Sequence, residues 1–79
     1  MDDITNIAAD WSDEITLTQD EDWQCKAGQV ELLINAEPGP NRSGSILPAP
    51  FKEKLRDGET VRYRRVGRVP AIIVRMARG

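Results

Sequence analysis

Short extended segments separated by turns are the feature that most constrains what this sequence can fold into. Apolar and polar residues alternate within 14–18, 30–35 and 60–65, and a period of two is the pattern of a β-strand with one buried face. Turn residues recur at intervals of about ten residues, a spacing that is typical of antiparallel sandwiches and barrels. The sequence therefore predicts an all-β fold, a small antiparallel β-sandwich or barrel of five to six short strands.

Glycine and proline mark the turns between these strands. Asp57-Gly58 gives the clearest signal, because this pair supplies the positive φ angles that tight turns need. Segment 37–44 is dense in proline and glycine and is long for a hairpin. Such loops are often functional, although a plain surface loop is the commoner explanation. Further strands are expected at 23–25, 45–47 and 71–77, and 51–55 is either a helical turn or an extended link.

Residues 1–13 form an acidic N-terminal arm, which precedes a single small β domain at 14–79. Ile4, Ile7 and Trp11 are spaced by three and four residues, which fits the apolar stripe of a short helix. A frayed arm is an equal alternative, because short isolated helices are marginal in water. In both cases Trp11 is expected to anchor the arm to a contact.

The formal net charge of -2 hides a separation of charge along the chain. Residues 1–22 carry eight acidic residues and no lysine or arginine, whereas 52–79 carry two lysines and seven arginines against three acidic residues. Such sorting indicates contacts between the two ends of the chain, between copies, or with a charged partner.

The arginines are the strongest candidates for a binding surface. Arg62 and Arg64 should stand side by side facing outward from a strand whose Val61 and Tyr63 face inward. Together with Arg65 they can also protect a free sheet edge. Their guanidinium groups can meet carboxylates of the same chain or of a neighbouring copy, phosphates of a nucleic acid, or only solvent. Nucleic acid is the weaker option, because stacking aromatic residues and known binding motifs are missing. The residues expected at an interface are Ile4, Ile7, Trp11, Arg62, Arg64, Arg65, Arg68 and Arg75.

Length and composition point to self-association. A chain of 79 residues buries a thin core, and small domains are usually supported by disulfides, metals or oligomerisation. Cys25 is the one cysteine and histidine is absent, so no disulfide, zinc site or cofactor is expected. The lack of histidine also argues against enzymatic activity. No membrane span or signal peptide is expected.

The tryptophans and the cysteine have simple structural explanations. Trp23 is expected in the core, with Cys25 beside it as a small buried apolar residue. Stacking of Trp11 and Trp23 on a sugar ring is the functional alternative.

The order of features resembles a group of small accessory virion proteins of tailed bacteriophages and gene-transfer particles. The similar stretches read EITLTQDEDWQCKAGQVELLINAEPGP, at 14–40, and LRDGETVRYRRVGRVPAIIVRMARG, at 55–79. Gly58-Glu59-Thr60 matches the turn into a strand, and 71–77 matches the last apolar strand. The resemblance implies a structural protein without enzyme chemistry that decorates heads or forms part of fibres or tails. It also implies a homo-oligomer, a trimer, which is made in the bacterial cytoplasm and docks on a larger capsid or tail protein of the virion.

Two other classes of function remain as alternatives. The chain could be a β-sheet binding module for nucleic acid or carbohydrate that uses its arginine-rich face. It could also be a small regulator that presents its acidic arm to a basic protein.

Overall fold

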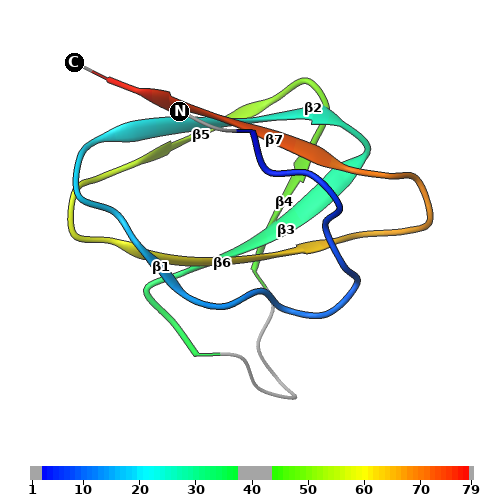
Figure 1. The fold of residues 1–79 in the computed structure, drawn as a ribbon, viewed down its shortest axis with the longest axis horizontal. Coiled ribbons are helices and arrows are strands. Elements are labelled where there is room, and N and C mark those ends of the chain that lie inside the picture. Colours follow the sequence, from blue (N-terminus) through cyan, green and yellow to red (C-terminus); the bar gives the residue numbers. More distant parts are fainter. Residues whose placement is uncertain (1–2, 38–43, 79) are drawn as a thin grey trace.

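The computed structural model describes residues 3–37 and 44–78, and these residues form seven strands and no helix. The strands are β1 (Ile15–Thr16), β2 (Glu21–Ala27), β3 (Gln29–Ile34), β4 (Ser45–Pro48), β5 (Lys52–Leu55), β6 (Thr60–Arg65) and β7 (Ile72–Ala77). They form two antiparallel sheets, one with the order β1-β6-β3-β4 and the other with the order β5-β2-β7 (Figure 1). The predicted all-β antiparallel fold is confirmed.

The predicted count of five to six strands is too low. The sequence of segment 51–55 allows a helical turn or an extended link, and the structure shows that residues 52–55 form strand β5, paired with β2. Its sequence, KEKL, carries little strand signal by itself. Its conformation is set by a strand that lies far away in sequence.

Three stretches of chain each supply one strand to each sheet, namely β2 and β3, β4 and β5, and β6 and β7. β2 runs into β3 through Gly28, so that one continuous stretch belongs to the three-stranded sheet at its start and to the four-stranded sheet at its end. We call β2, Gly28 and β3 together the central strand. Gly28 has a φ of +68°, and a Cβ at this position would lie 2.7 Å from the carbonyl oxygen of Pro70. Glycine is therefore required where the central strand turns from one sheet into the other. The same change of sheet occurs between β4 and β5, at Ala49-Pro50.

The hydrophobic core lies between the two sheets. It contains Trp23 and Cys25 of β2, both with no exposed surface, and it also includes Val30 and Val61 from the opposite sheet. The Trp23 ring meets the half-buried Tyr63 ring edge-on, with centroids 6.2 Å apart. Each fully buried large side chain of this kind stabilises the fold by about 1.5 to 3 kcal/mol relative to exposure. The predictions that Trp23 and Cys25 are buried are confirmed.

The arginines of β6 do not protect a free edge, contrary to that expectation. β6 lies between β1 and β3. β1 pairs only with Thr60 and Val61, and the N-terminal segment covers the same side of β6 at residues 62–65. The sheet edges without a neighbouring strand in the described part of the chain include β4 and β5, whose edge positions carry Pro48, Lys52 and Lys54. Proline and lysine are the residues that proteins commonly place on edges to prevent unwanted pairing.

The N-terminal segment, residues 3–13, is extended and not helical. Asn6 adopts a φ of 55°, which is incompatible with a continuous right-handed helix. Ile4 forms a bridge with Ile73 of β7, and the segment then passes in front of the two sheets toward β1 (Figure 1). The helical interpretation of the spacing of Ile4, Ile7 and Trp11 is therefore wrong. Each apolar residue reaches its contact from an extended backbone.

Candidate functional site

Backbone hydrogen bonds tie the N-terminal segment to β6 and β7. Ile4 and Ile73 exchange two bonds, of 2.8 and 3.0 Å between nitrogen and oxygen. The N–H of Arg65 donates to the carbonyl oxygen of Ala8 at 2.8 Å, and the N–H of Ser12 donates to that of Tyr63 at 2.9 Å. We call residues 62–65 of β6, together with Ile73 of β7, the segment-binding edge.

Two apolar side chains of the N-terminal segment add to this attachment. Ile7 is 5% exposed and belongs to the core, and the half-buried Ile4 packs against it. Trp11 lies under the guanidinium group of Arg64, whose carbon is 4.4 Å from the ring centroid. A cation over an indole ring at such a partly exposed place contributes about 0.5 to 1 kcal/mol.

Arg64 also neutralises a buried carboxylate. Its Nε donates to Oε1 of Glu31 at 2.6 Å, and the backbone N–H of Gly44 donates to the other oxygen at 2.7 Å. Glu31 is 5% exposed. Burial raises the pKa of this carboxyl, but the Gly44 amide and the Arg64 guanidinium outweigh the burial, and the pKa lies below its ordinary value. Arg64 thus contacts both Trp11 of the N-terminal segment and the carboxylate of Glu31 on β3.

A second arginine, Arg75, repeats this arrangement inside the molecule. Its Nε and one terminal nitrogen donate to the two oxygens of Glu21 at 2.8 and 2.9 Å. The Trp23 indole donates to the same carboxylate at 2.8 Å, and the Arg75 guanidinium lies 5.1 Å from the Trp23 centroid. Burial raises the pKa of Glu21, but Arg75 and Trp23 outweigh it, so the pKa is lowered. The pair fixes the end of β7 against β2.

Arg62 makes weaker contacts at the surface. One terminal nitrogen donates to the carbonyl oxygen of Ser12 at 3.2 Å, and the other donates to the exposed carboxylate of Glu37 at 3.3 Å. Glu14 lies 4.0 Å away. Exposed ion pairs of this kind contribute about 0 to 1 kcal/mol, so Arg62 positions the N-terminal segment more than it stabilises the protein.

The structure brings most of the predicted interface residues together within one chain. Arg62, Arg64 and Arg65 surround the backbone of the segment that carries Ile4, Ile7 and Trp11. Arg75 is half-buried on β7 and is bound to Glu21 of β2. Arg68 is exposed on the loop between β6 and β7. Carboxylates of the same chain are therefore partners of Arg62, Arg64 and Arg75.

Sequence reasoning missed the two glutamates that these arginines bind. Glu21 shares the inward face of β2 with Trp23, and Glu31 lies directly across from Arg64 in the register of β3 and β6. An acidic residue two positions before a core tryptophan was the available signal for Glu21. The pairing of Glu31 with Arg64 depends on register, which the sequence alone does not give.

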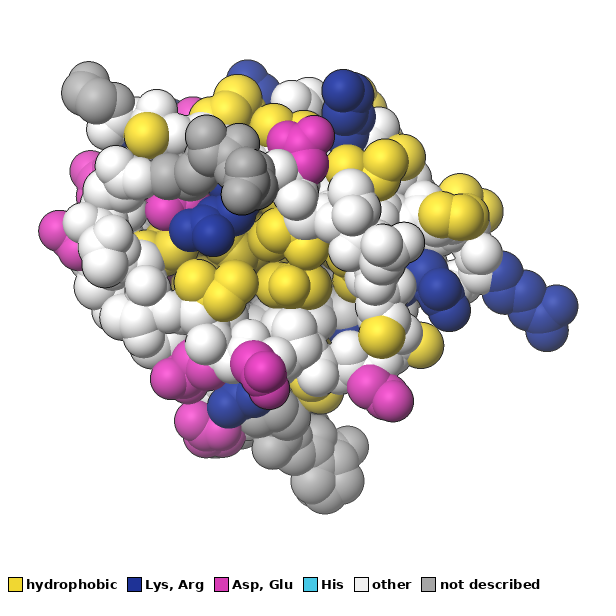
Figure 2. All heavy atoms as spheres, in the orientation of Figure 1, with side chains coloured by type: hydrophobic (Ala, Val, Ile, Leu, Met, Phe, Trp, Pro, Cys, Tyr) yellow, Lys and Arg dark blue, Asp and Glu magenta, His cyan; other side chains and the backbone are white. Residues whose placement is uncertain are grey.

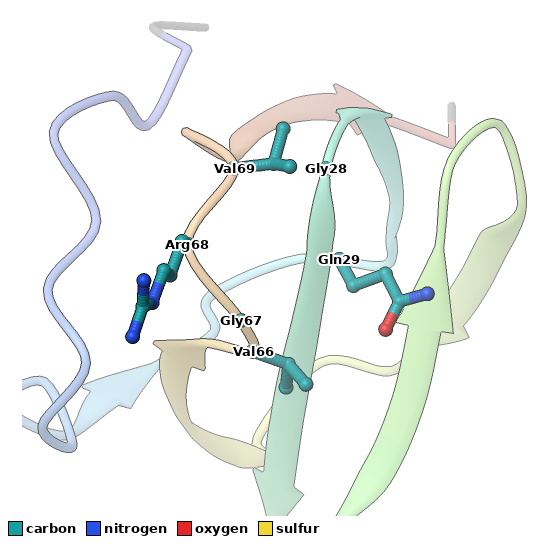
Figure 3. A pocket seen from close by; sticks show the side chains of 6 residues that line it. All are labelled: Gly28, Gln29, Val66, Gly67, Arg68 and Val69. Atoms are coloured by element: carbon teal, nitrogen blue, oxygen red, sulfur yellow. The ribbon is translucent and has the colours of Figure 1, made fainter.

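A pocket of about 360 Å³ lies at the end of the molecule where the central strand changes sheet. Its lining consists of Gly28, Gln29, Val66, Gly67, Arg68 and Val69 (Figure 3). The Arg68 side chain points away from Gln29. Figure 2 shows a basic side chain projecting at the same end of the molecule, where Figure 1 places the loop between β6 and β7. The pocket is open, and its lining includes one charged side chain and two valines. It therefore offers few groups that could recognise a particular ligand.

The other notable surface consists of the two edge strands β4 and β5, one in each sheet, with the turn at Ala49-Pro50 between them. Ile46 on β4 is 53% exposed, and Phe51, immediately before β5, is 63% exposed. The Cys25 N–H donates to the carbonyl oxygen of Phe51. Because antiparallel ladders alternate, the backbone groups of Lys52 and Lys54 then point away from β2, toward the open side. We call residues 45–55 the open edge.

Three further results concern metals, membranes and relatives. Among residues 3–37 and 44–78, no group of three acidic or cysteine side chains is placed to hold a metal ion. In the same two stretches no helix is long and apolar enough to cross a membrane. No protein-family model, curated protein or solved structure matches the chain.

Proposed function

We propose that this chain is a structural protein that assembles with copies of itself and docks on a larger component of a phage-like particle. The observation that carries the proposal is the open edge, which holds Ile46 and Phe51, two of the three exposed large hydrophobic residues within 3–37 and 44–78. Exposed apolar side chains beside unpaired backbone groups are typical of contacts between proteins. In this proposal the two sheets form a β-sandwich, and residues 1–13 are its N-terminal arm.

The chemistry of the open edge favours a limited contact between copies. Pro48 has no N–H to donate, and Lys52 and Lys54 would face like charges if two β5 strands paired antiparallel about Glu53. Side-chain contacts by Ile46 and Phe51 therefore carry more of the interface than strand addition does. Such an edge supports a closed oligomer better than an endless sheet.

The size of the surface is compatible with such an assembly. The accessible surface of the chain is 4991 Å², and a stable interface takes roughly 800 Å² from each partner. A copy would therefore contribute about a sixth of its surface, more than two side chains supply. Figure 2 shows apolar side chains gathered at the centre of one face as well, which provides further area for a larger partner.

Docking on a virion component, and a trimer as the oligomer, follow from the resemblance of this chain to small accessory virion proteins. That resemblance includes the Gly58-Glu59-Thr60 turn, which leads into β6, and the last apolar strand, which is β7. A bacterial cytoplasm as the place of synthesis and the virion as the final location belong to the same proposal.

The test is the oligomeric state of the intact chain and of edge variants. Native mass spectrometry at micromolar concentration should give an oligomer of defined copy number, and Ile46→Asp or Phe51→Asp should give monomers with an unchanged far-UV circular dichroism spectrum. Val69→Asp is the matched control, because Val69 is as exposed as Phe51, at 63%, but lies outside the open edge. A monomeric wild-type chain, or equal effects of Phe51→Asp and Val69→Asp, would contradict the proposal.

Nucleic-acid binding is a second candidate, and Arg68 beside the pocket favours it. Arg68 is exposed and Arg65 is half-buried on the strand that precedes the loop, and a cationic loop is suited to phosphate contacts. In a fluorescence anisotropy titration, a labelled oligonucleotide should then bind in a salt-dependent way, and Arg68→Glu should weaken the binding. The carbohydrate version has less support, because Trp23 is buried and Arg64 covers one face of Trp11.

A further inference from the structure

We propose that the N-terminal segment exchanges between copies, so that residues 3–12 of one chain bind the segment-binding edge of a neighbouring chain. The inference rests on the proposed self-assembly and adds the surface and the occupant that join two copies. The occupant is the same segment of a second copy, because the chain's own segment is seen seated on this edge.

The N-terminal segment is separate from the sheets in its construction. It contributes to no strand, and among the described residues it is tied to β6 and β7 by four backbone hydrogen bonds. Ile7, which is 5% exposed, is its one buried side chain. The rest of the core comes from residues at or beyond Leu17. The two sheets therefore keep most of their apolar interior when the segment leaves, but the site of Ile7 must be filled again.

Two exposed acidic residues connect the segment to the first strand. Asp13 and Glu14 lie between Ser12, which binds Tyr63, and Ile15, which pairs with Val61. Rotation of the backbone at this polar connection redirects the segment without changing β1. Short connections of this kind are the usual hinges of domain swapping.

Every contact of the segment can be repeated by a second copy. The Ile4 and Ile73 backbone pair, the Ile7 site and the stacking of Trp11 on Arg64 each join residues on opposite sides of the hinge. Exchange conserves these contacts, so the two arrangements differ mainly in the hinge and in the entropy of association. In an assembly the neighbouring copies are held at a high effective concentration, which favours the exchanged form.

Charge supports the same occupant. Asp3 and Asp10 of the segment are exposed, whereas the segment-binding edge carries Arg62, Arg64 and Arg65. An acidic extended chain therefore suits this edge. The charge sorting of the sequence then has a physical role, because it directs the start of one chain to the last third of another.

The experiment uses full-length variants in a Cys25→Ala background, because Cys25 lies directly across from Ile73 in the β2 and β7 ladder and could form an intrachain disulfide with Ile73→Cys. Ile4→Cys is made in one preparation and Ile73→Cys in another, since these residues are paired across the bridge. The two are mixed, assembled and oxidised. A covalent heterodimer on a non-reducing gel is the expected result, and each variant alone should give far less dimer. Each single variant then carries one cysteine, so no disulfide can form within one chain.

The control pair reports on cross-linking that does not depend on exchange. Thr16→Cys and Thr60→Cys change partners within the β1 and β6 ladder, on the domain side of the hinge. Mixing these two single variants should give no specific heterodimer, whereas the double variant should close an intrachain disulfide. The double variant Ile4→Cys/Ile73→Cys should form covalent multimers.

The outcomes separate this inference from the proposed function. Oligomers in native mass spectrometry without the Ile4→Cys and Ile73→Cys heterodimer would overturn the exchange and leave self-assembly in place. A double variant that closes only intrachain disulfides within the oligomer would overturn the exchange as well. Monomers at all concentrations would overturn both.

Discussion

Replacing Arg75 by methionine tests the energetic role of the buried carboxylate of Glu21. Glu21 is 1% exposed, and the Arg75 side chain is 22% exposed. Removing the partner of a fully buried charge costs about 3 to 5 kcal/mol. Partial access of water at Arg75 and the remaining bond from Trp23 reduce this cost, so we expect a loss of about 2 to 3 kcal/mol in the free energy of unfolding. That is a large fraction of the roughly 4 to 12 kcal/mol expected for a domain of 79 residues.

The loss should depend on pH in a defined direction. The folded-state pKa of Glu21 lies below the ordinary value of 4.5, so ionisation of this group stabilises the wild type above that pH, and this contribution disappears as the pH falls through the folded pKa. Arg75→Met removes the guanidinium group that lowers the pKa of Glu21, so burial raises this pKa in the variant. The penalty in the variant is therefore relieved as the pH falls. The difference in stability between wild type and variant should be largest near neutral pH and should shrink in acid.

The assay is urea denaturation followed by far-UV circular dichroism, which does not depend on Trp23 as the reporter. A double-mutant cycle of Glu21→Gln and Arg75→Met isolates the interaction of the two side chains. Arg62→Met is the matched control, because Arg62 binds the 73% exposed side chain of Glu37, and it should cost less than about 1 kcal/mol. A loss from Arg75→Met no greater than that of the control, or one that grows in acid, would refute the reasoning.

Two other predictions concern the bend of the central strand and the core thiol. Gly28→Ala places a Cβ 2.7 Å from the Pro70 oxygen at a φ of +68°, and should lower the free energy of unfolding by at least about 2 kcal/mol. Gly58→Ala, at a φ of +88° with open space around it, should cost only about 1 kcal/mol in the same denaturation experiment. Cys25 is fully buried, and burial raises the pKa of its thiol, so it should react with a thiol reagent only as fast as the protein opens. Rapid labelling without unfolding would contradict that placement.

Much of the fold could be predicted from local pattern. The strand expected at 60–65 is β6, with the same bounds, and its inward Val61 and half-buried Tyr63 follow the period of two. The strand expected at 71–77 differs from β7 by one residue. In both cases alternation with β-branched residues is decided within the segment itself.

The errors occurred where distant segments decide the structure. Strand β5 owes its conformation to pairing with β2, and the N-terminal segment owes its extended path to the pairing of Ile4 with Ile73. Spacings of three and four residues between apolar side chains predicted a helix, but the partners of Ile4 and Trp11 lie more than fifty positions further along the chain. Local propensity gives way to such tertiary contacts.

The sequence predicted which residues belong to the candidate site better than it predicted which of them form ion pairs. The residues expected at an interface include six that meet around the N-terminal segment, but Arg75 is half-buried and binds Glu21. Burial of a glutamate is unusual without a partner, and that partner is identified only when the register of the strands is known. The distribution of charge along the sequence therefore indicated attraction between the two ends of the chain, but it did not identify which residues form ion pairs.

The passage of the central strand through Gly28 has a consequence for how the protein folds and unfolds. β2 and β3 form one uninterrupted stretch that pairs with segments 45–55 and 60–77 in both sheets, so neither layer consists of a local piece of chain. One layer cannot be dismantled while the other stays intact, because each long strand would have to be released at its middle. Amide protons of the two layers should accordingly exchange with solvent through a shared, global opening, and the folding rate should be set by the search for distant pairings.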